Sequence, residues 1–198
     1  MLKKLTVDEA IKALRNDEVI AIPTDTVYGV CARMNSRKAM ERLVAAKNRP
    51  SSKAFPLMCS DVRQVEQIAQ VDEVAARVLN GLMPGPLTVV LRKKDGLGDW
   101  IAPGMASIAV RLATSQALQQ IIDELGEPVF MTSANQSGMA PCCSAEEIEE
   151  QCPLAYGIVE GEVPFGQAST IVDLTESGFR ILREGPVSMN TIKEVANA

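Results

Sequence analysis

The chain has 198 residues, of which 46% are hydrophobic, 23% charged and 4% aromatic, which is typical of soluble globular domains and not of disordered or fibrous chains. It contains no histidine, which excludes His-dependent nucleophile pairs, histidine general bases and His-ligated zinc. The formal net charge of -5 argues against a protein that coats long nucleic acids.

The remaining composition predicts the compartment and the number of domains. Five cysteines without a CxxC pair indicate a reduced, cytoplasmic setting, and we expect the adjacent Cys142 and Cys143 to be inert. The chain has neither an apolar run of about 18 residues nor the apolar core of a signal peptide, so we expect no membrane association. Without a repeat or a linker, residues 1–198 are expected to form a single α/β domain.

The amino-terminal part predicts alternating helices and strands. Thr6 and Glu9 have the spacing of a capping box, which predicts the start of the first helix. The β-branched run 19–22 predicts a strand that ends in the polar loop PTDTVYG. Ser36 is a suitable cap for a second helix, which ends before residues 47–53, and a further strand is predicted at 55–59.

The same alternation continues to the end of the chain. Two helices are predicted, near 61–69 and 72–82, before the breaker MPGP. Strands are predicted at 87–91 and 108–112, a helix at 115–125, and a strand at 129–131 that opens into the polar loop TSANQSG. Ser144 and Glu147 have capping-box spacing. The remainder predicts strands near 158, at 170–174 and at 179–182, and then a helix from Thr191.

Polar loops that follow apolar strands are candidate ligand sites, because crevices of α/β sheets tend to lie at strand ends. The first loop gathers hydroxyls and a carboxylate from Thr24, Asp25, Thr26 and Tyr28, which can fix a small polar ligand. The loop TSANQSG supplies uncharged donors and acceptors. Ordinary turn formation explains both loops about as well.

Five cations are candidates for binding an anion. Lys47, Arg49 and Lys53 are close in sequence and suit phosphates or carboxylates, although they could also be solvated cations at the end of the preceding helix. Arg111 and Arg183 lie in apolar strands, where an arginine is usually bound to an anion or paired with an acid. No glycine-rich nucleotide motif occurs, so side-chain cations would have to hold any triphosphate.

Seven blocks occur in the order and approximate spacing of one family: PTDTVYG, KNRP, PGPLTVVL, VRL, TSANQSG, ASTIVD and LREG. From Val19 to Gly185 the chain closely resembles the YrdC-type threonylcarbamoyl-AMP synthases in their short, single-domain form. The family's paired Lys-x-Arg and Ser-x-Asn signature is present as Lys47, Arg49, Ser133 and Asn135. The resemblance implies a twisted, largely mixed α/β sheet flanked by helices, with a concave basic cavity.

The implied activity is that of a nucleotidyltransferase that converts L-threonine, bicarbonate and ATP into threonylcarbamoyl-AMP, pyrophosphate and water. Mg²⁺ would accompany ATP, with no metal held by the protein and no prosthetic group. The product would serve separate tRNA threonylcarbamoyl-transferase proteins, which modify the adenosine beside the anticodon, with tRNA as a transient partner.

The resemblance also implies the residues of the site. The signature residues Lys47, Arg49, Ser133 and Asn135 would form the catalytic group. L-threonine would contact Thr26, Arg111, Ser133 and Ser169, with Arg111 facing its carboxylate as a fork. ATP would contact Lys47, Arg49, Lys53, Ser107, Asn135, Cys143 and Arg183.

Other expectations concern the surroundings of the site. The pocket cations should face solvent, so that Lys47→Ala and Arg49→Ala change the melting temperature by only a few degrees. Asp25 and Tyr28 are candidates for a general base on proximity alone. Met58 lies where some relatives offer a polar group near threonine. We expect the extra C-terminal domain of longer relatives to be missing.

Two alternative functions remain open. A related carbamoyl-adenylate chemistry, as in the hydrogenase-maturation relatives, would use carbamoyl phosphate in place of threonine and bicarbonate. A non-catalytic protein of the same fold would bind RNA or a nucleotide in the basic concavity.

Overall fold

The protein is described by a computed structural model that covers residues 2–48, 54–136, 138–142, 144–163, 167–176 and 178–198. Within these ranges, ten strands form one sheet in the order β1-β8-β2-β3-β7-β4-β6-β5-β9-β10. The strands are β1 (Lys3–Lys4), β2 (Ile20–Pro23), β3 (Tyr28–Arg33), β4 (Leu57–Cys59), β5 (Leu87–Arg92), β6 (Ser107–Leu112), β7 (Val129–Ser133), β8 (Gly157–Ile158), β9 (Thr170–Asp173) and β10 (Arg180–Arg183). The helices are α1 (Val7–Arg15), α2 (Arg37–Lys47), α3 (Val62–Ile68), α4 (Glu73–Leu82), α5 (Gln116–Leu125), α6 (Ala145–Gln151) and α7 (Met189–Ala196).

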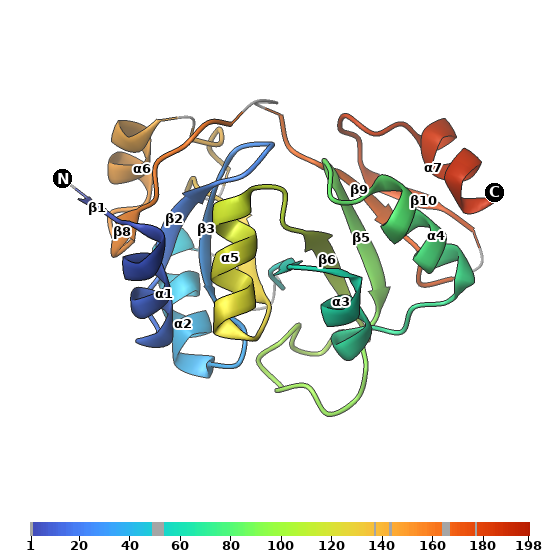
Figure 1. The fold of residues 1–198 in the computed structure, drawn as a ribbon, viewed down its shortest axis with the longest axis horizontal. Coiled ribbons are helices and arrows are strands. Elements are labelled where there is room, and N and C mark those ends of the chain that lie inside the picture. Colours follow the sequence, from blue (N-terminus) through green and yellow to red (C-terminus); the bar gives the residue numbers. More distant parts are fainter. Residues whose placement is uncertain (1, 49–53, 137, 143, 164–166, 177) are drawn as a thin grey trace.

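The sheet contains both parallel and antiparallel pairs. The hairpin β2–β3 is antiparallel, as are the pairs β3–β7, β4–β7, β5–β6 and β9–β10. The pairs β1–β8, β2–β8, β4–β6 and β5–β9 are parallel. The mixed sheet flanked by helices, which the sequence resemblance implied, is therefore confirmed. Figure 1 shows β1 and α1 at one end of the molecule and β10 and α7 at the other.

Alternating side chains divide the core between the two faces of the sheet. On β2, Ile20 and Ile22 pack with the apolar side chains of α1 and α5, whereas Ala21 packs in the larger cluster with residues of α2, α3, α4 and α7. Because successive strand residues point to opposite faces, these two clusters lie on opposite sides of the sheet. The helices α1 and α5 contact each other and lie over the β2–β3 half of the sheet (Figure 1). On that face of the sheet, α1 and α5 therefore leave the strands β6, β5, β9 and β10 uncovered.

Side-chain caps fix the helix starts where the sequence predicted them. Thr6 and Glu9 form the complete capping box at α1, with both reciprocal hydrogen bonds present. Ser36 caps α2, and Ser144 accepts a hydrogen bond from the backbone N–H of Glu147 at α6. The helix α2 ends at Lys47, and the C-cap residue Asn48 follows with a left-handed φ of 44°, a conformation that asparagine tolerates better than most residues.

Several expected boundaries were wrong. Tyr28 and Gly29 belong to the strand β3, although the sequence placed them in a polar loop. The strand β7 continues through Thr132 to Ser133, into the segment expected to be a loop. The last helix begins at Met189, two residues before the predicted start, because Ser188 caps it. The strand β1 was not predicted at all, since its two lysines carry no apolar pattern.

Candidate functional site

A cavity of about 700 Å³ opens on the sheet face that α5 leaves uncovered. Its walls come from β4, β5, β6, β9 and β10, from the end of β7, and from the loop between β2 and β3. On β6, Ser107, Ala109 and Arg111 line the cavity and Val110 packs in the core on the other face, while Ile108 belongs both to that core cluster and to the cavity lining. Met58 and Met131 belong both to the core cluster under α5 and to the cavity lining, so the cavity begins where that core ends.

Most of the predicted site residues come together in this cavity. Seven of them line it: Thr26, Ser107, Arg111, Ser133, Asn135, Ser169 and Arg183. Lys47 is not among the lining residues, and Arg49, Lys53 and Cys143 lie outside the described residues. The sheet pairing explains the convergence, because it places the ends of β2, β6, β7, β9 and β10 around one face.

Arg111 occupies a buried position in the middle of the site. Its Nε and Nη2 donate to the carbonyl oxygen of Gly85 at 3.1 and 3.0 Å, and its Nη1 donates to Thr26 Oγ1 at 3.0 Å. Its Nη2 also donates to Asp25 Oδ1, forming a buried ion pair. Burial lowers the pKa of the Arg111 guanidinium from its ordinary value, and the charge of Asp25 opposes that shift.

This geometry corrects one expectation and confirms another. Arg111 does not present a free fork to a carboxylate, because four of its five N–H groups already have partners. The alternative that an acid pairs with this arginine is confirmed, and that acid is Asp25. Sequence reasoning could not select Asp25 among the 25 acidic residues, because it lies 86 positions away in the chain.

Arg183 and Ser169 form a second polar group on the cavity wall. Arg183 donates from Nε to the carbonyl oxygen of Ser169 at 2.9 Å and from Nη2 to its Oγ at 3.0 Å. The hydroxyls of Ser169 and Thr88 share a hydrogen bond of 2.8 Å. The register of β10 on β9 shifts between Ile181 and Arg183, and this irregularity lets both Leu182 and Arg183 reach the cavity.

Lys47 lies behind the cavity wall and holds the segment that follows β7. Its Nζ donates to the carbonyl oxygens of Ser133, at 2.5 Å, and Asn135, and to Asn135 Oδ1 at 3.1 Å. Only 2% of Lys47 is exposed, so the expectation of a solvent-facing cation was wrong. The ammonium thus donates to two backbone carbonyl oxygens at the end of β7, and burial makes such hydrogen bonds costly to lose.

The amide of Asn135 completes this network. Its Oδ1 accepts from Ser133 Oγ at 2.5 Å, and its Nδ2 donates to the carbonyl oxygens of Gln136 and Met139 at 2.7 and 2.8 Å. Both ends of the amide are therefore used within the turn. The Lys-x-Arg and Ser-x-Asn signature residues that the structure describes thus act on one another, and their contacts fix the shape of one cavity wall.

Sequence reasoning missed several lining residues. Arg180 of β10 is among the lining residues, with its side chain 75% exposed, and it pairs with Asp173 at 2.8 Å, while Asp173 also accepts from Thr175. Of the five large hydrophobic side chains that are exposed in the described part of the chain, three also line the cavity, namely Met105, Met139 and Leu182. Such apolar side chains at a cavity mouth suit a ligand with an apolar part. The alternation in RILR could have indicated Arg180, but the β10 irregularity obscures the pattern.

Neither candidate general base lines the cavity. The Tyr28 hydroxyl donates to the carbonyl oxygen of Gly161 at 2.8 Å and accepts from its N–H at 3.2 Å. Asp25 is paired with Arg111. Tyr28 therefore anchors the segment after β8, and its hydroxyl proton is already donated there.

Acidic groups are sparse around the cavity. Among the lining residues, Asp173 carries the one carboxylate, against the guanidinium groups of Arg111, Arg180 and Arg183. The described part of the chain contains no group of three or more His, Cys, Asp or Glu residues that could hold a metal ion. None of the described helices has the length and apolar character needed to cross a lipid bilayer.

Sequence comparison places the chain among known proteins. Residues 12–185 match the sequence model of the Sua5/YciO/YrdC family, whose description reads "Telomere recombination". A curated threonylcarbamoyl-AMP synthase from Yersinia pestis (strain Pestoides F) is 34% identical over 158 residues, which cover 78% of this chain and 83% of that protein.

Solved structures agree with the sequence match. P. abyssi Sua5 in complex with L-threonine is 30% identical with a TM-score of 0.89, over 98% of this chain and 58% of the Sua5 chain. E. coli YciO is 26% identical with a TM-score of 0.83, over 94% of this chain and 92% of that one. This chain thus spans less than two thirds of Sua5 and nearly all of YciO. On these matches, the chain belongs to the Sua5/YciO/YrdC family.

Proposed function

We propose that this protein is a threonylcarbamoyl-AMP synthase, which forms threonylcarbamoyl-AMP, pyrophosphate and water from L-threonine, bicarbonate and ATP. The observation that carries the proposal is one cavity in which Thr26, Arg111, Ser133 and Ser169 lie beside Arg183 in a member of this family. The curated relative bears the name of this enzyme, and the Sua5 neighbour was solved with L-threonine. Both support the synthase over the carbamoyl-phosphate and RNA-binding alternatives.

The proposed chemistry matches the groups on the cavity wall. The amine of threonine and bicarbonate form a carbamate with loss of water, and the carbamate oxygen attacks the α-phosphorus of ATP while pyrophosphate leaves. This step needs alignment of two anions and neutralisation of charge on phosphate oxygens. Arg183 and Arg180 are suitable for the phosphates, and Thr26, Ser133 and Ser169 are suitable for threonine. Arg49, Lys53 and Cys143 remain proposed ATP contacts from the family resemblance, and Ser107 and Asn135 add polar groups at the cavity.

We assign Mg²⁺ to the nucleotide and not to a resident protein site. The lining residues that the structure describes include one carboxylate, Asp173, and it already bonds to Arg180 and Thr175. The lining residues therefore do not fit a protein-held Mg²⁺ site, and phosphate oxygens and water supply ligands of the kind that this ion prefers. The product would pass to tRNA threonylcarbamoyl-transferase proteins in the cytoplasm, with tRNA as a transient partner at most.

The test is pyrophosphate release by the purified protein with ATP, Mg²⁺, bicarbonate and L-threonine. We expect release that depends on both bicarbonate and threonine, and a product with the mass of threonylcarbamoyl-AMP. Release that is indifferent to either compound would refute the proposal. Replacing bicarbonate and threonine with carbamoyl phosphate distinguishes the related carbamoyl-adenylate activity, which would then be the one observed.

Calorimetry with ATP, L-threonine and RNA separates the enzyme from a binding protein. The synthase is expected to bind ATP and threonine. Tight binding of RNA without binding of either small substrate would instead favour the non-catalytic alternative.

A further inference from the structure

The hydrogen bonds around Arg111 leave one defined place for a ligand. A guanidinium has five N–H groups, and here Gly85 takes two, Asp25 takes one and Thr26 takes one. One N–H on Nη1 has no partner among the described residues. Because Arg111 and Thr26 both line the cavity, this remaining donor lies next to the Thr26 hydroxyl.

The Thr26 hydroxyl offers the complementary group, an acceptor. Thr24 Oγ1 donates to the carbonyl oxygen of Val27 at 2.7 Å and accepts from the backbone N–H groups of Thr26 and Val27 at 3.2 and 3.3 Å. With the Thr24 proton on Val27, the Thr26 hydroxyl donates in the 2.9 Å bond between the two hydroxyls. Thr26 Oγ1 then accepts from Arg111 and keeps one free lone pair. A donor for a carboxylate thus lies beside an acceptor for an amine, and this pair is complementary to the carboxylate and amine of an α-amino acid.

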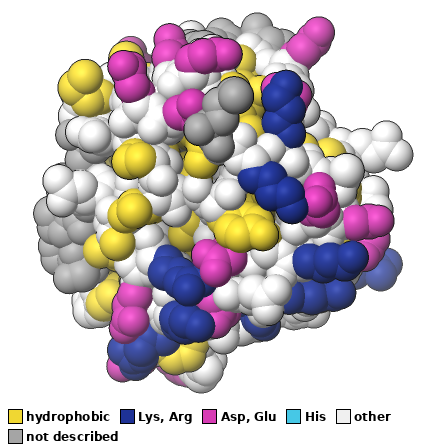
Figure 2. All heavy atoms as spheres, turned by 90° about the vertical axis from the view of Figure 1, so that its left-hand side faces the viewer, with side chains coloured by type: hydrophobic (Ala, Val, Ile, Leu, Met, Phe, Trp, Pro, Cys, Tyr) yellow, Lys and Arg dark blue, Asp and Glu magenta, His cyan; other side chains and the backbone are white. Residues whose placement is uncertain are grey.

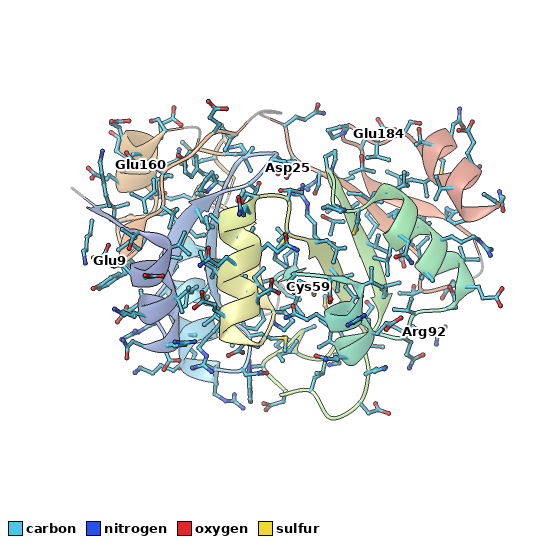
Figure 3. The ribbon with its side chains drawn as sticks, in the orientation of Figure 1. Glu9, Asp25, Cys59, Arg92, Glu160 and Glu184 are labelled. Atoms are coloured by element: carbon cyan, nitrogen blue, oxygen red, sulfur yellow. The ribbon has the colours of Figure 1, made fainter. Side chains whose placement is uncertain are left out.

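Stability alone does not account for the Asp25–Arg111 pair. The Asp25 and Arg111 side chains are only 12% and 8% exposed, so both charges lose most of their hydration. The second oxygen of the carboxylate, Asp25 Oδ2, is buried and accepts no hydrogen bond from the described residues. Asp25 lies in the β2–β3 connection above the start of α5, where its backbone N–H contacts Thr114 Oγ1 at 3.4 Å (Figure 3). An incompletely satisfied buried pair is a costly way to stabilise a fold.

We propose that Asp25 is a positioning residue that holds Arg111 so that it meets the carboxylate of an amino-acid substrate through one N–H only. The inference rests on the proposed function, which supplies that substrate. Asp25 competes with the substrate for the guanidinium, so it weakens binding of a bare carboxylate. Asp25 also fixes the orientation of Arg111 and thereby that of the bound substrate. The substrate amine, held at Thr26, then presents its lone pair to bicarbonate. Selection then falls on compounds that carry both an amine and a carboxylate.

The direct test is Asp25→Asn, which keeps the size of the side chain and removes its charge. The asparagine Oδ1 can still accept from Nη2, but a neutral amide competes for the guanidinium more weakly than a carboxylate does. The substrate carboxylate can then displace it, so the KM for L-threonine is expected to fall by about threefold or more. Because the substrate is then misaligned, kcat is expected to fall by about tenfold or more. The compound 3-hydroxybutyrate, which is threonine without its amino group, is expected to inhibit the variant more strongly than the unchanged protein.

A matched control is Glu127→Gln. Glu127 is also a buried carboxylate that pairs with an arginine, Arg33, at 2.7 Å, and it lies outside the cavity lining. This variant is expected to lose stability with the KM for threonine unchanged. A purely structural role for Asp25 would give the same result as the control, because a lower amount of folded protein reduces kcat without lowering KM.

The outcomes separate the inference from the proposed function. Turnover by the unchanged protein combined with an unchanged or higher KM in Asp25→Asn would overturn the inference alone. No threonine-dependent turnover in the unchanged protein would overturn the proposed function and the inference with it. If circular dichroism shows that Asp25→Asn is unfolded, Asp25→Glu keeps the charge but moves the carboxylate by one methylene. A fall in kcat is then expected, and an unchanged kcat would overturn the inference.

Discussion

Lys47 shows how one buried ammonium can organise a site without lining it. Three of the oxygens that accept from its ammonium belong to Ser133, the last residue of β7, and to Asn135 in the turn that follows. Replacing it by Met keeps an unbranched chain but leaves these oxygens buried without that donor. At about 1–3 kcal/mol for each unsatisfied group, Lys47→Met is expected to lose about 3 kcal/mol or more of unfolding free energy. A thermal melt should show a decrease of roughly 6–12 °C.

Lys193→Met provides the comparison, because Lys193 is an exposed lysine of α7. We expect it to change the unfolding free energy by less than about 0.5 kcal/mol. If both lysine variants melt within a few degrees of the unchanged protein, Lys47 carries no structural role and the original expectation of a solvated cation is restored.

The cysteines allow a separate prediction for single residues. Cys31 and Cys59 are buried, and burial raises the pKa of Cys31 to about 12 and also raises that of Cys59. Since the thiolate is the reactive form, both thiols are expected to resist a thiol reagent at pH 8 in the native state and to react fully in denaturant. Peptide mass spectrometry measures the labelling. Fast native labelling of either thiol would contradict the packing described for β3 and β4.

The sequence identified many residues of the site but not their contacts. Thr26, Ser133 and Arg183 could be assigned to the site through the ordered family blocks, since turn formation or an ion pair explained each of them about as well from residue type alone. The partner of Arg111 and the burial of Lys47 depend on which strands are neighbours in the sheet. That information is held in long-range pairing, which periodicity along one segment does not contain.

At the scale of elements, the sequence did not predict the strand β3, whose residue Gly29 lines the cavity. Gly29 pairs with Ser133 of β7, and a Cβ at Gly29 would meet Met131 Sδ at 2.4 Å. Because Met131 also lines the cavity, its flexible side chain can move into that space. Gly29→Ala is therefore expected to cost only about 1 kcal/mol while raising the KM for threonine several-fold, as measured by thermal melts and pyrophosphate release.

The double variant Gly29→Ala with Met131→Ala tests this explanation, because removing the thioether makes room for the new methyl group. We expect the KM for threonine to return toward its original value. A KM that stays high in the double variant would show that the backbone of β7, and not the Met131 side chain, had been displaced.

Helices were easier to predict than strands for a physical reason. Ser36, Ser144 and the Thr6–Glu9 pair mark helix starts through contacts within four residues, so local sequence is sufficient. The strand β3 is apolar throughout its first five residues because both faces are covered, and it therefore lacks the alternation of a half-buried strand. The irregularity that turns Arg183 toward the cavity likewise depends on the partner strand β9.

At the scale of the whole molecule, charge is distributed unevenly between the outer surface and the cavity. Figure 2 shows the end formed by α1, α2 and α6, where Lys and Arg alternate with Asp and Glu and acidic groups gather over α6. The described part of the cavity lining has the opposite balance, with three arginines and one aspartate. A net charge of -5 is thus compatible with a site for anions. The composition gives only the net charge of the whole chain and not its distribution between the surface and the cavity.

The same arrangement predicts how substrates affect the stability of the fold. The cavity walls come from β4, β5, β6, β9 and β10 together with the β2–β3 loop, so a bound ligand bridges distant parts of the sheet. A ligand present at 100 times its Kd stabilises the folded state by about 2.7 kcal/mol. At this chain length, saturating Mg²⁺-ATP is expected to raise the melting temperature by roughly 5–11 °C. Arg183→Ala should reduce that rise, whereas Arg92→Ala, at an arginine outside the cavity lining, should preserve it. An equal loss of the rise in both variants would place nucleotide binding elsewhere on the molecule.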